Sequence, residues 1–463
     1  MLRSVPQIWN QSGLGPEYRR YPAEPHMSKL SGKPPSGTRD FFGGELFRRE
    51  AAIAVVKETF QRFGFEPLET PAFERLDLLS GKYGDDEKLI FKIAKRGAKA
   101  TGGDADLALR YDLTLPLARY VAARDFTREG MFRRYQIGPV WRADRPGRGR
   151  FREFFQCDVD IVGSDSPLAD AETILAATEA LRRLGLGRFV VRLNSRKILY
   201  TLLSEYGTPP GMEPSAIAAI DKLLKVGVDG VVAELRERGL PTEFIGAFLE
   251  DQAASDIVVA VEDRLARSPA GEPALAEVRA VEQLVRSQLR GGQVVFDPFI
   301  ARGLDYYTGP VFEVFYAAEP DALPLSIASG GRYDELLSMF GRASVPATGA
   351  SLGLERILML LPDSVGSTVS VPEVLVTVWD EASRADALAL GTALRDAGMS
   401  VETYVGSGGL KAQLRHAERR GARLCVIAGP DERERGVVTV RDLTTGEQRT
   451  GPPSGLLALV RSP

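Results

Sequence analysis

The sequence contains very little histidine and cysteine. Its 463 residues include two histidines, His26 and His416, and two cysteines, Cys157 and Cys425. The cysteines are far apart and lack Cys-x-x-Cys spacing, which argues against a disulfide scaffold or a structural zinc site and favours a cytoplasmic protein. Neither histidine lies in a catalytic motif, which argues against a His-based triad, a His metal site or a His general base. Any catalysis must therefore use arginines, carboxylates and backbone groups.

Long apolar runs are also absent. No run of about 18 apolar residues occurs, so no membrane-spanning helix and no membrane association are predicted. Residues 1–35 are rich in Pro, Gly, Ser and Tyr and lack the apolar core of a secretory signal, so we expect a disordered leader, with Met27 as an alternative start. The net charge of −3 does not predict general nucleic-acid binding. The length predicts roughly two to four domains.

Positive charge is concentrated in one part of the chain. Residues 119–152 contain ten arginines and no lysine. A guanidinium group makes bidentate contacts with phosphates and carboxylates that lysine cannot make. The segment therefore predicts a site for anionic ligands, and an ordinary solvated charged face is the alternative.

Residues 131–143 and 153–163 are predicted to form two strands joined by the loop 144–150. The two-residue period of the second strand gives it one apolar face, which is expected to pack against a core. The opposite face carries an aromatic ring and three polar groups: Phe154, Gln156, Asp158 and Asp160. Such a face suits the floor of a site, and it equally suits a solvent-exposed sheet surface.

The segment 302–314 combines a predicted strand, over 310–316, with an unusual turn before it. The turn holds Arg302, Asp305, Tyr306 and Tyr307 together with two glycines. A core strand needs none of these residues, whereas a small polar ligand held against a rigid strand does. A tight turn with an ordinary surface arginine is the alternative.

Helices and strands are predicted along the rest of the chain. Helical apolar spacing covers about 44–63, and Gly64 ends it. Residues 210–290 read as several short amphipathic helices, and sheet-like segments resume at 293. Beyond a linker rich in Ser and Val, strands at 374–378, 401–405 and 424–428 alternate with helices at about 381–397 and 409–420, and a hairpin-like segment follows. This pattern predicts a small α/β domain with a mostly parallel sheet.

Taken together, these segments resemble a class II aminoacyl-tRNA synthetase, and specifically the histidyl-tRNA synthetase family. The resemblance covers residues 36–463. Gly37–Asp40 resembles the opening signature of the family, and the helix, the Gly64 turn and the strand ending at Pro71 resemble motif 1. The strands around Arg142 and Phe154 resemble motif 2, and Gly349–Arg356 resembles motif 3. The histidine family is distinguished by two further segments, Arg302–Tyr307 and Ser329–Asp334.

The resemblance implies an α/β protein. Its α+β catalytic core has an antiparallel sheet and a helical insertion, and a C-terminal α/β anticodon-binding domain follows. The implied partners are ATP with Mg²⁺, L-histidine, tRNA(His) and a second copy of the chain in a homodimer. The implied divisions are the leader (1–35), the core with motifs 1 and 2 (36–205), the helical insertion (206–291), the rest of the core with motif 3 (292–362), a linker (363–372) and the anticodon-binding domain (373–463).

The resemblance also implies roles in activating histidine with ATP. Arg142 is expected to contact the α-phosphate and the histidine carboxylate, and Arg302 is expected to approach the α-phosphate from the opposite side. Arg150 would reach the outer phosphates. Phe154 and Arg356 would hold the adenine between them by stacking and cation–π contact. No protein metal ligand is implied.

The same resemblance assigns the amino-acid site. Asp112, Leu113 and Thr114 resemble the segment that holds the substrate α-amino group, with a turn or cap role as the alternative. Gln156 would bind near the carboxylate and act close to the transfer chemistry. The histidine pocket would be lined by Asp160, Tyr306 and Tyr307, with one tyrosine of the pair expected to touch the ligand. Gly330 and Gly331 would permit close backbone approach.

Some features leave alternatives. Asp144 in the loop between the two strands stands where Glu is common, and Tyr111-Asp112 stands where many bacterial members have Pro-Glu. The expected contact of Asp112 with the substrate amino group could therefore be direct or water-bridged. The helix 411–420 would place Lys411, Arg415 and Arg419 on one face, for RNA contact or simply for solvent. His416 is expected to be a surface or packing residue.

Two rival identities are a non-catalytic paralogue, the regulatory subunit of ATP phosphoribosyltransferase, and a synthetase-like protein repurposed for RNA or protein binding.

Overall fold

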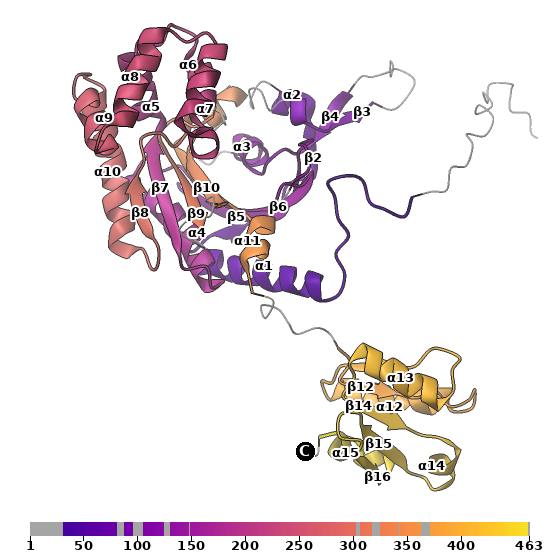
Figure 1. Cartoon of the computed structure of the whole chain (residues 1–463). Coiled ribbons are helices and arrows are strands. Elements are labelled where there is room, and N and C mark those ends of the chain that lie inside the picture. The colour runs from indigo at the N-terminus through magenta and orange to yellow at the C-terminus, as the bar shows by residue number, and fades with distance from the viewer. Residues whose placement is uncertain are drawn as a thin grey trace, which may run out of the picture.

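A computed structural model describes residues 31–80, 88–95, 105–124, 130–147, 149–301, 306–316, 325–341, 343–362 and 371–461. Among these residues, eight strands form the main sheet, in the order β1-β5-β6-β11-β10-β9-β7-β8 (Figure 1). The outermost pairs, β1 with β5 and β7 with β8, are parallel, and the pairs between them are antiparallel. The strands are β1 (Glu66–Pro67), β5 (Phe132–Trp141), β6 (Glu153–Val162), β7 (Phe189–Ser195), β8 (Gln293–Phe296), β9 (Pro310–Tyr316), β10 (Leu325–Arg332) and β11 (Ala347–Gly353).

One face of this sheet is covered by helices α1 (Gly44–Arg62) and α4 (Pro167–Arg183), and the main hydrophobic core lies between them and the strands. The predicted apolar face of β6 enters this core through Cys157, Val159 and Ile161, all at most 1 % exposed. The predicted helix at 44–63 and the strands at 131–143, 153–163 and 310–316 are confirmed to within a few residues.

A second, smaller core lies on another side of the main sheet, where a three-stranded sheet and three short helical segments pack. It buries side chains of helix α3 together with Tyr307, Tyr333 and Leu336. The elements are β2 (Phe73–Arg75), α2 (Leu76–Leu79), β3 (Lys92–Ala94), β4 (Ala105–Leu109), α3 (Thr114–Ala122) and the 3₁₀ segment η3 (Asp334–Phe340). Short α11 (Leu354–Leu360) follows β11 directly.

The predicted helices between 210 and 290 are present, and Figure 1 shows α6–α9 gathered into one group. Their buried side chains join the core of the main sheet, so the inserted helices share one hydrophobic interior with it. Inside the group, Arg264 binds Asp251 at 2.8 Å, and Asp251 also accepts a hydrogen bond from the Tyr206 hydroxyl at 2.7 Å. The helices are α5 (Arg196–Glu205), α6 (Glu213–Ile220), α7 (Leu223–Glu237), α8 (Thr242–Ala253), α9 (Ile257–Leu265) and α10 (Gly271–Gln288).

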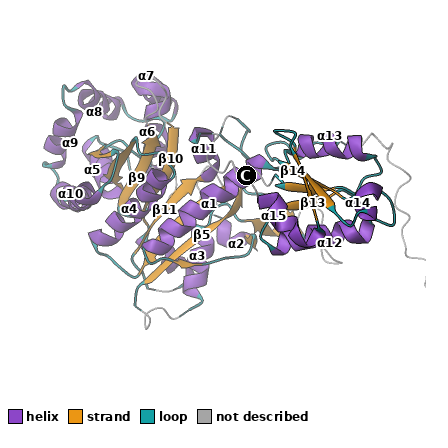
Figure 2. Ribbon diagram, turned by 90° about the horizontal axis from the view of Figure 1, so that it is seen from below, coloured by secondary structure: helices purple, strands orange, loops and turns teal. Residues whose placement is uncertain are grey.

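Residues 371–461 build their own five-stranded sheet, in the order β13-β12-β14-β15-β16, with helices on both faces (Figure 2). Along β12 the side chains alternate: Val374 and Val376 pack with α12 and α15, and Leu375 packs with α13. The elements are β12 (Val374–Val376), α12 (Arg384–Asp396), β13 (Val401–Thr403), α13 (Leu410–Arg420), β14 (Leu424–Ile427), α14 (Pro430–Glu434), β15 (Val438–Asp442), β16 (Gln448–Gly451), the 3₁₀ segment η4 (Pro453–Gly455) and α15 (Leu456–Arg461).

The prediction of a mostly parallel sheet in this domain is wrong. Strands β13, β12 and β14 are mutually parallel, but β15 and β16 pair antiparallel with their neighbours. The reason is that β15 and β16 form a hairpin that adds to the edge of β14. No helix in the described ranges is long and apolar enough to cross a membrane.

Candidate functional site

A cavity of about 410 Å³ lies on the polar face of the main sheet. Strand β6 crosses its floor, and β10, β11, the segment before α3 and the Tyr306–Tyr307 turn add walls. Every predicted site residue in the described ranges except Leu113 lines it: Asp112, Thr114, Arg142, Arg150, Phe154, Gln156, Asp160, Tyr306, Tyr307 and Arg356. Thus residues up to 244 positions apart in the chain share one cavity.

Strand β6 arranges the cavity floor in the predicted way. Phe154, Gln156, Asp158 and Asp160 all line the cavity, while the alternate residues enter the core. The choice between a site floor and a solvent-exposed surface is therefore decided in favour of the floor, since Asp158 and Asp160 are each only 2 % exposed. At about 3.3 Å per residue, the run from Phe154 to Asp160 spans roughly 20 Å.

The motif 2 loop, residues 142–152, brings arginine to the start of β6. The guanidinium of Arg142 lies 4.2 Å from the ring centre of Tyr111 and 5.2 Å from that of Phe154, and its Nε donates to the Tyr111 carbonyl at 3.2 Å. Arg150 binds the carboxylate of Asp144 at 2.7 Å and keeps about half of its side chain exposed. To reach a phosphate, the Arg150 guanidinium must therefore release the Asp144 carboxylate or bind the carboxylate and the phosphate at the same time.

The Gly37–Asp40 segment holds this loop in place. The backbone N–H of Arg152 donates to the Gly37 carbonyl at 2.8 Å, and the Arg39 guanidinium lies 3.6 Å from the ring centre of Phe151. Gly37 has φ +83°, and a Cβ there would lie 2.7 Å from the Arg152 side chain. Only glycine meets both demands.

The motif 3 segment joins β11 to α11 at the same end of the cavity. Glu355 is buried, and its carboxylate binds Arg49 of α1 at 3.0 Å and the backbone N–H of Phe155 at 3.0 Å. This carboxylate therefore fixes the start of α11 to both α1 and β6. The next residue, Arg356, reaches the cavity and donates to the Ser326 carbonyl of β10 at 2.9 Å.

The segment before α3 has a structural role as well as a place at the cavity. One Asp112 oxygen, Oδ1, accepts from the backbone N–H groups of Thr114 and Leu115 at 3.1 and 3.0 Å, as in a helix cap. Leu113 is fully buried and does not line the cavity in the described structure. Instead its carbonyl accepts a hydrogen bond from Arg134 at 3.1 Å. The cap role considered as an alternative is thus present for Asp112.

A buried charge cluster closes the other end of the β6 floor. Arg134 of β5 is fully buried and pairs with Asp160 at 2.8 Å, and the Tyr333 hydroxyl donates to the same carboxylate. Burial raises the pKa of Asp160 and the pKa of Tyr333, so the phenol stays protonated as a donor. Burial also raises the pKa of Asp158 to about 7, with Asp160 and Asp112 adding to the rise and Arg134 opposing it.

The aromatic side chains at this end pack closely. The rings of Tyr306 and Tyr307 lie 4.9 Å apart, and Tyr306 meets Tyr333 edge-on at 6.0 Å. Both residues of the pair line the cavity, with Tyr307 the more buried. Gly331 is closely packed, since a Cβ there would lie 2.6 Å from the Pro310 carbonyl oxygen and 3.0 Å from the Tyr307 ring. The motif 3 glycine Gly349 is equally constrained, because a Cβ there would lie 2.1 Å from Asp160 Oδ1.

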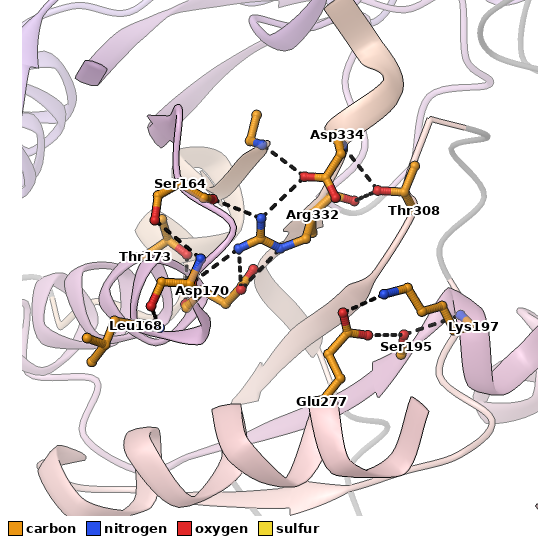
Figure 3. Close-up of polar contacts among 12 residues, drawn as sticks. Ser164, Leu168, Asp170, Thr173, Ser195, Lys197, Glu277, Thr308, Arg332 and Asp334 are labelled. Carbon is orange, nitrogen blue, oxygen red and sulfur yellow. Dashed lines mark hydrogen bonds and ion pairs between the residues drawn. The ribbon is translucent and has the colours of Figure 1, made fainter. Parts of the chain in front are cut away.

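Arg332 anchors the Ser329–Asp334 segment to helix α4 (Figure 3). Its guanidinium binds Asp170 of α4 at 2.5 Å and Asp334 at 3.3 Å, and it donates to the Ser164 carbonyl at 2.9 Å. Thr308 is tied to the same network, because its backbone N–H donates to the Arg332 carbonyl at 2.8 Å. Arg332 therefore fixes both Tyr333 and the end of the Tyr306–Tyr307 turn relative to α4.

Some predicted residues cannot be placed, and some functional candidates were not predicted. Arg302, with the rest of 302–305, lies outside the described residues. Tyr333, Ser351 and Arg134 received no role from the sequence, although each lies in a segment singled out there. Asp221, at the end of α6, also lines the cavity, and no pattern in the sequence indicated that it would.

Some arginines of the segment 119–152 pair with carboxylates inside the protein, and others line the cavity or are exposed. Arg119 makes a bidentate pair with Glu74, Arg133 pairs with Glu172, and Arg134 is buried in the charge cluster. Arg142 and Arg150 line the cavity, and Arg145 is exposed. The alternative of a single solvated charged face is therefore wrong for this segment, because internal partners hold several of its guanidinium groups.

Comparisons with known proteins agree with this geometry. A family model described as histidyl-tRNA synthetase matches residues 37–357, and one described as an anticodon binding domain matches residues 373–462. A histidine–tRNA ligase of Gloeobacter violaceus is 38% identical over 90% of this chain and 95% of its own length. One of Cytophaga hutchinsonii is 36% identical over 89% and 96%.

Solved structures give the same result. The crystal structure of histidyl-tRNA synthetase from Nostoc sp. PCC 7120 superimposes with a TM-score of 0.69 at 30% identity, covering 94% of this chain and 100% of that one. A Bacillus halodurans protein described as an ATP phosphoribosyltransferase regulatory subunit/histidyl-tRNA synthetase shares the fold, with a TM-score of 0.66 at 23% identity over 85% and 97%. On these matches, together with the cavity and its motifs, the chain belongs to the histidyl-tRNA synthetase family.

Proposed function

We propose that this chain is a histidine–tRNA ligase, which activates L-histidine with ATP to histidyl-adenylate and then transfers it to the 3′ end of tRNA(His). The observation that carries the proposal is the composition of one cavity. Arginines and an aromatic ring stand where β6 begins, and the Asp160–Tyr333 pair stands where it ends, roughly 20 Å away. A nucleotide joined to an amino acid is of about that length.

The chemistry requires two anions to react. The histidine carboxylate attacks the α-phosphate of ATP, the bond to the β-phosphate breaks so that pyrophosphate leaves, and negative charge develops on the phosphate oxygens. Preorganised cations stabilise that charge, and no protein nucleophile or general base is needed. We assign this work to Arg142 and Arg302 as catalytic residues, with Arg150 on the outer phosphates. Mg²⁺ is proposed to enter as the ATP complex and to neutralise the phosphates. Among the described residues there is no cluster of three His, Cys, Asp or Glu side chains suited to a metal ion.

The adenine site is proposed between Phe154 and Arg356. Phe154 presents its ring at the start of β6, and Arg356 is held at the start of α11 by its bond to the Ser326 carbonyl. A purine inserted between them gains stacking on one face and a cation–π contact on the other.

The histidine site is proposed at the far end of the floor. An imidazole carries one donor and one acceptor, which a carboxylate and a phenol can match. Asp160 and the tyrosines 306, 307 and 333 supply those groups in a buried setting. A substrate without matching groups would leave buried polar atoms unpaired, at a cost of about 1–3 kcal/mol each. Asp112, Thr114 and Gln156 are proposed to hold the α-amino and carboxylate groups.

The tRNA is proposed to meet the chain at two places. Its 3′ end would approach the motif 2 loop, where Arg145 is exposed, and its anticodon would bind residues 373–462. In α13, Lys411, Arg415 and Arg419 are exposed on one face and suit phosphate contact. We further propose that the chain works as a homodimer through the motif 1 region and in the cytoplasm.

The rival function, a non-catalytic regulatory subunit, is disfavoured by two features. Both the Arg302–Tyr307 segment and the C-terminal domain are present in the sequence, and such paralogues usually lack or degrade them. The test is ATP–pyrophosphate exchange with purified protein. We expect exchange that depends on histidine and on no other natural amino acid. A folded protein without histidine-dependent exchange would exclude the proposed activation step.

A further inference from the structure

Two acceptor atoms on the cavity floor have neither a hydrogen-bond donor nor an ion-pair partner within the described protein. They are Oε1 of Gln156 and Oδ1 of Asp158, and both atoms are buried. The two residues lie two positions apart on the same face of β6, and both line the cavity. Buried acceptors are nearly always satisfied in folded proteins. Their missing donors therefore have to come from a ligand or from water in the cavity.

The orientation of the Gln156 amide follows from its neighbour on β11. Its Nε2 donates to the Ser351 hydroxyl at 2.9 Å, which leaves Oε1 facing away from Ser351. Ser351 stands directly opposite Asp158 in the β6–β11 ladder. Burial raises the pKa of Asp158, and the neighbouring Ser351 hydroxyl, as a donor, opposes that rise. A hydroxyl has one proton, so a Ser351 that donates to Asp158 can only accept from Gln156.

The surroundings of Asp158 leave its charge only partly compensated. Arg134 faces it from β5, Asp160 from β6, Asp112 from the segment before α3, and Ser351 from β11. Two buried arginines, Arg134 and Arg110, act on Asp158, and Arg134 also pairs with Asp160 at 2.8 Å and donates to the Leu113 carbonyl. Such a cluster favours a ligand that brings positive charge and several N–H donors.

We propose that Asp158 and Ser351 are positioning residues for the cationic end of the amino-acid substrate. Ser351 holds the Gln156 amide so that Oε1 faces the ligand, and Asp158 both holds Ser351 and presents Oδ1 as a second acceptor. The group that fits two adjacent acceptors beside partly compensated negative charge is a primary ammonium. The inference rests on the proposed function, because it takes the ligand of this cavity to be an amino acid.

The test compares Ser351→Ala and Asp158→Asn with the wild type and with Ser351→Thr, which keeps the hydroxyl. The probes are L-histidine, histamine, which keeps the amine and lacks the carboxylate, and imidazolepropionate, which lacks the amine. Binding of each is measured by calorimetry, and the KM values for histidine and ATP are measured by pyrophosphate exchange.

We expect Ser351→Ala and Asp158→Asn to weaken histidine and histamine at least tenfold. Imidazolepropionate binding and the KM for ATP should stay within about twofold of the wild type, and Ser351→Thr should recover most of the loss. In a double-mutant cycle, Ser351→Ala should add little to Gln156→Ala, since Ser351 acts through Gln156.

Two results would overturn the inference while leaving the proposed function intact. One is wild-type histidine-dependent exchange together with unchanged histamine binding in Ser351→Ala. The other is an equal loss for both analogues, which would indicate a general packing defect. A wild type that neither binds histidine nor catalyses exchange would overturn both the inference and the proposed function.

Discussion

The hydroxyl of Tyr333 donates a hydrogen bond to the carboxylate of Asp160, across 173 positions of the chain. Asp160 is also paired with the buried Arg134. Its position and orientation are therefore set by the protein before any ligand enters. A preorganised acceptor discriminates between ligands better than a mobile one, because it cannot turn away from a ligand that lacks the matching donor.

Tyr333→Phe should weaken histidine use through this contact. Loss of a hydrogen bond to a charged group costs about 1.5–3 kcal/mol, so the KM for histidine should rise roughly 10- to 100-fold. The KM for ATP should change little, because the proposed nucleotide end of the cavity is far along β6. Pyrophosphate exchange measures both constants. Tyr200→Phe, at an exposed position on α5, is the matched control. An unchanged histidine KM in Tyr333→Phe would remove Tyr333 from the amino-acid site.

The Arg332–Asp170 pair should contribute strongly to stability. Both side chains are about 5 % exposed and lie 2.5 Å apart. Removing one partner of a buried pair leaves an uncompensated charge, at a cost of roughly 3–5 kcal/mol. Arg332→Met should therefore lower the free energy of unfolding by that order in urea denaturation. The exposed Arg384–Glu381 pair is the control, and Arg384→Met should cost less than about 1 kcal/mol. Equal effects of the two substitutions would contradict the anchoring role.

Asp158 should make stability depend on pH in a defined direction. The pKa of Asp158 is raised to about 7 by burial and lies near 3.9 in an unfolded chain, so the folded state binds the proton more tightly. Stability is then lost as pH rises from about 4 to about 7, and the full penalty is present above that. Asp158→Asn removes the penalty. Its unfolding free energy relative to the wild type should increase by on the order of 2–3 kcal/mol between pH 5 and pH 8. Urea denaturation at the two pH values measures the difference, and a constant difference would show that Asp158 does not titrate in this range.

Arg302→Ala separates chemistry from tRNA binding. Arg302 lies outside the described residues, and its role comes from the family resemblance. If it stabilises charge on the α-phosphate, adenylate formation should fall by orders of magnitude, since removing one such group costs about 10²–10³ in rate. Affinity for tRNA should stay nearly unchanged in a filter-binding assay. Comparable losses in both measurements would contradict the assigned role.

Local patterns in the sequence predicted much of this architecture. The two-residue alternation of β6 placed Gln156 and Asp160 on the site face and Cys157 in the core, because a strand has a fixed period. The spacing of apolar residues located α1, α10 and α13 in the same way, because a helix also has a fixed period. The predicted cavity residues came from motif resemblance, since no periodic pattern indicates which distant segments converge.

Sequence patterns did not indicate which residues far apart in the chain pair with each other. The pairing of Arg134 with Asp160 depends on the register of β5 against β6, and that of Arg119 with Glu74 depends on how α3 packs. Both arginines looked like part of a ligand-facing charge run, but both pair with carboxylates of the protein, Arg134 in full burial and Arg119 with a third of its side chain exposed. The C-terminal hairpin was recognised, but its antiparallel addition to the β14 edge was not, because sheet order depends on tertiary packing.

The most direct test of the central claim is aminoacylation of tRNA(His) by the purified full chain with radiolabelled amino acids. We expect that histidine alone is attached, that the reaction requires ATP and Mg²⁺, and that Arg142→Ala reduces its rate by about 10²-fold or more. Attachment of another amino acid, or no attachment of histidine by a folded protein, would contradict it.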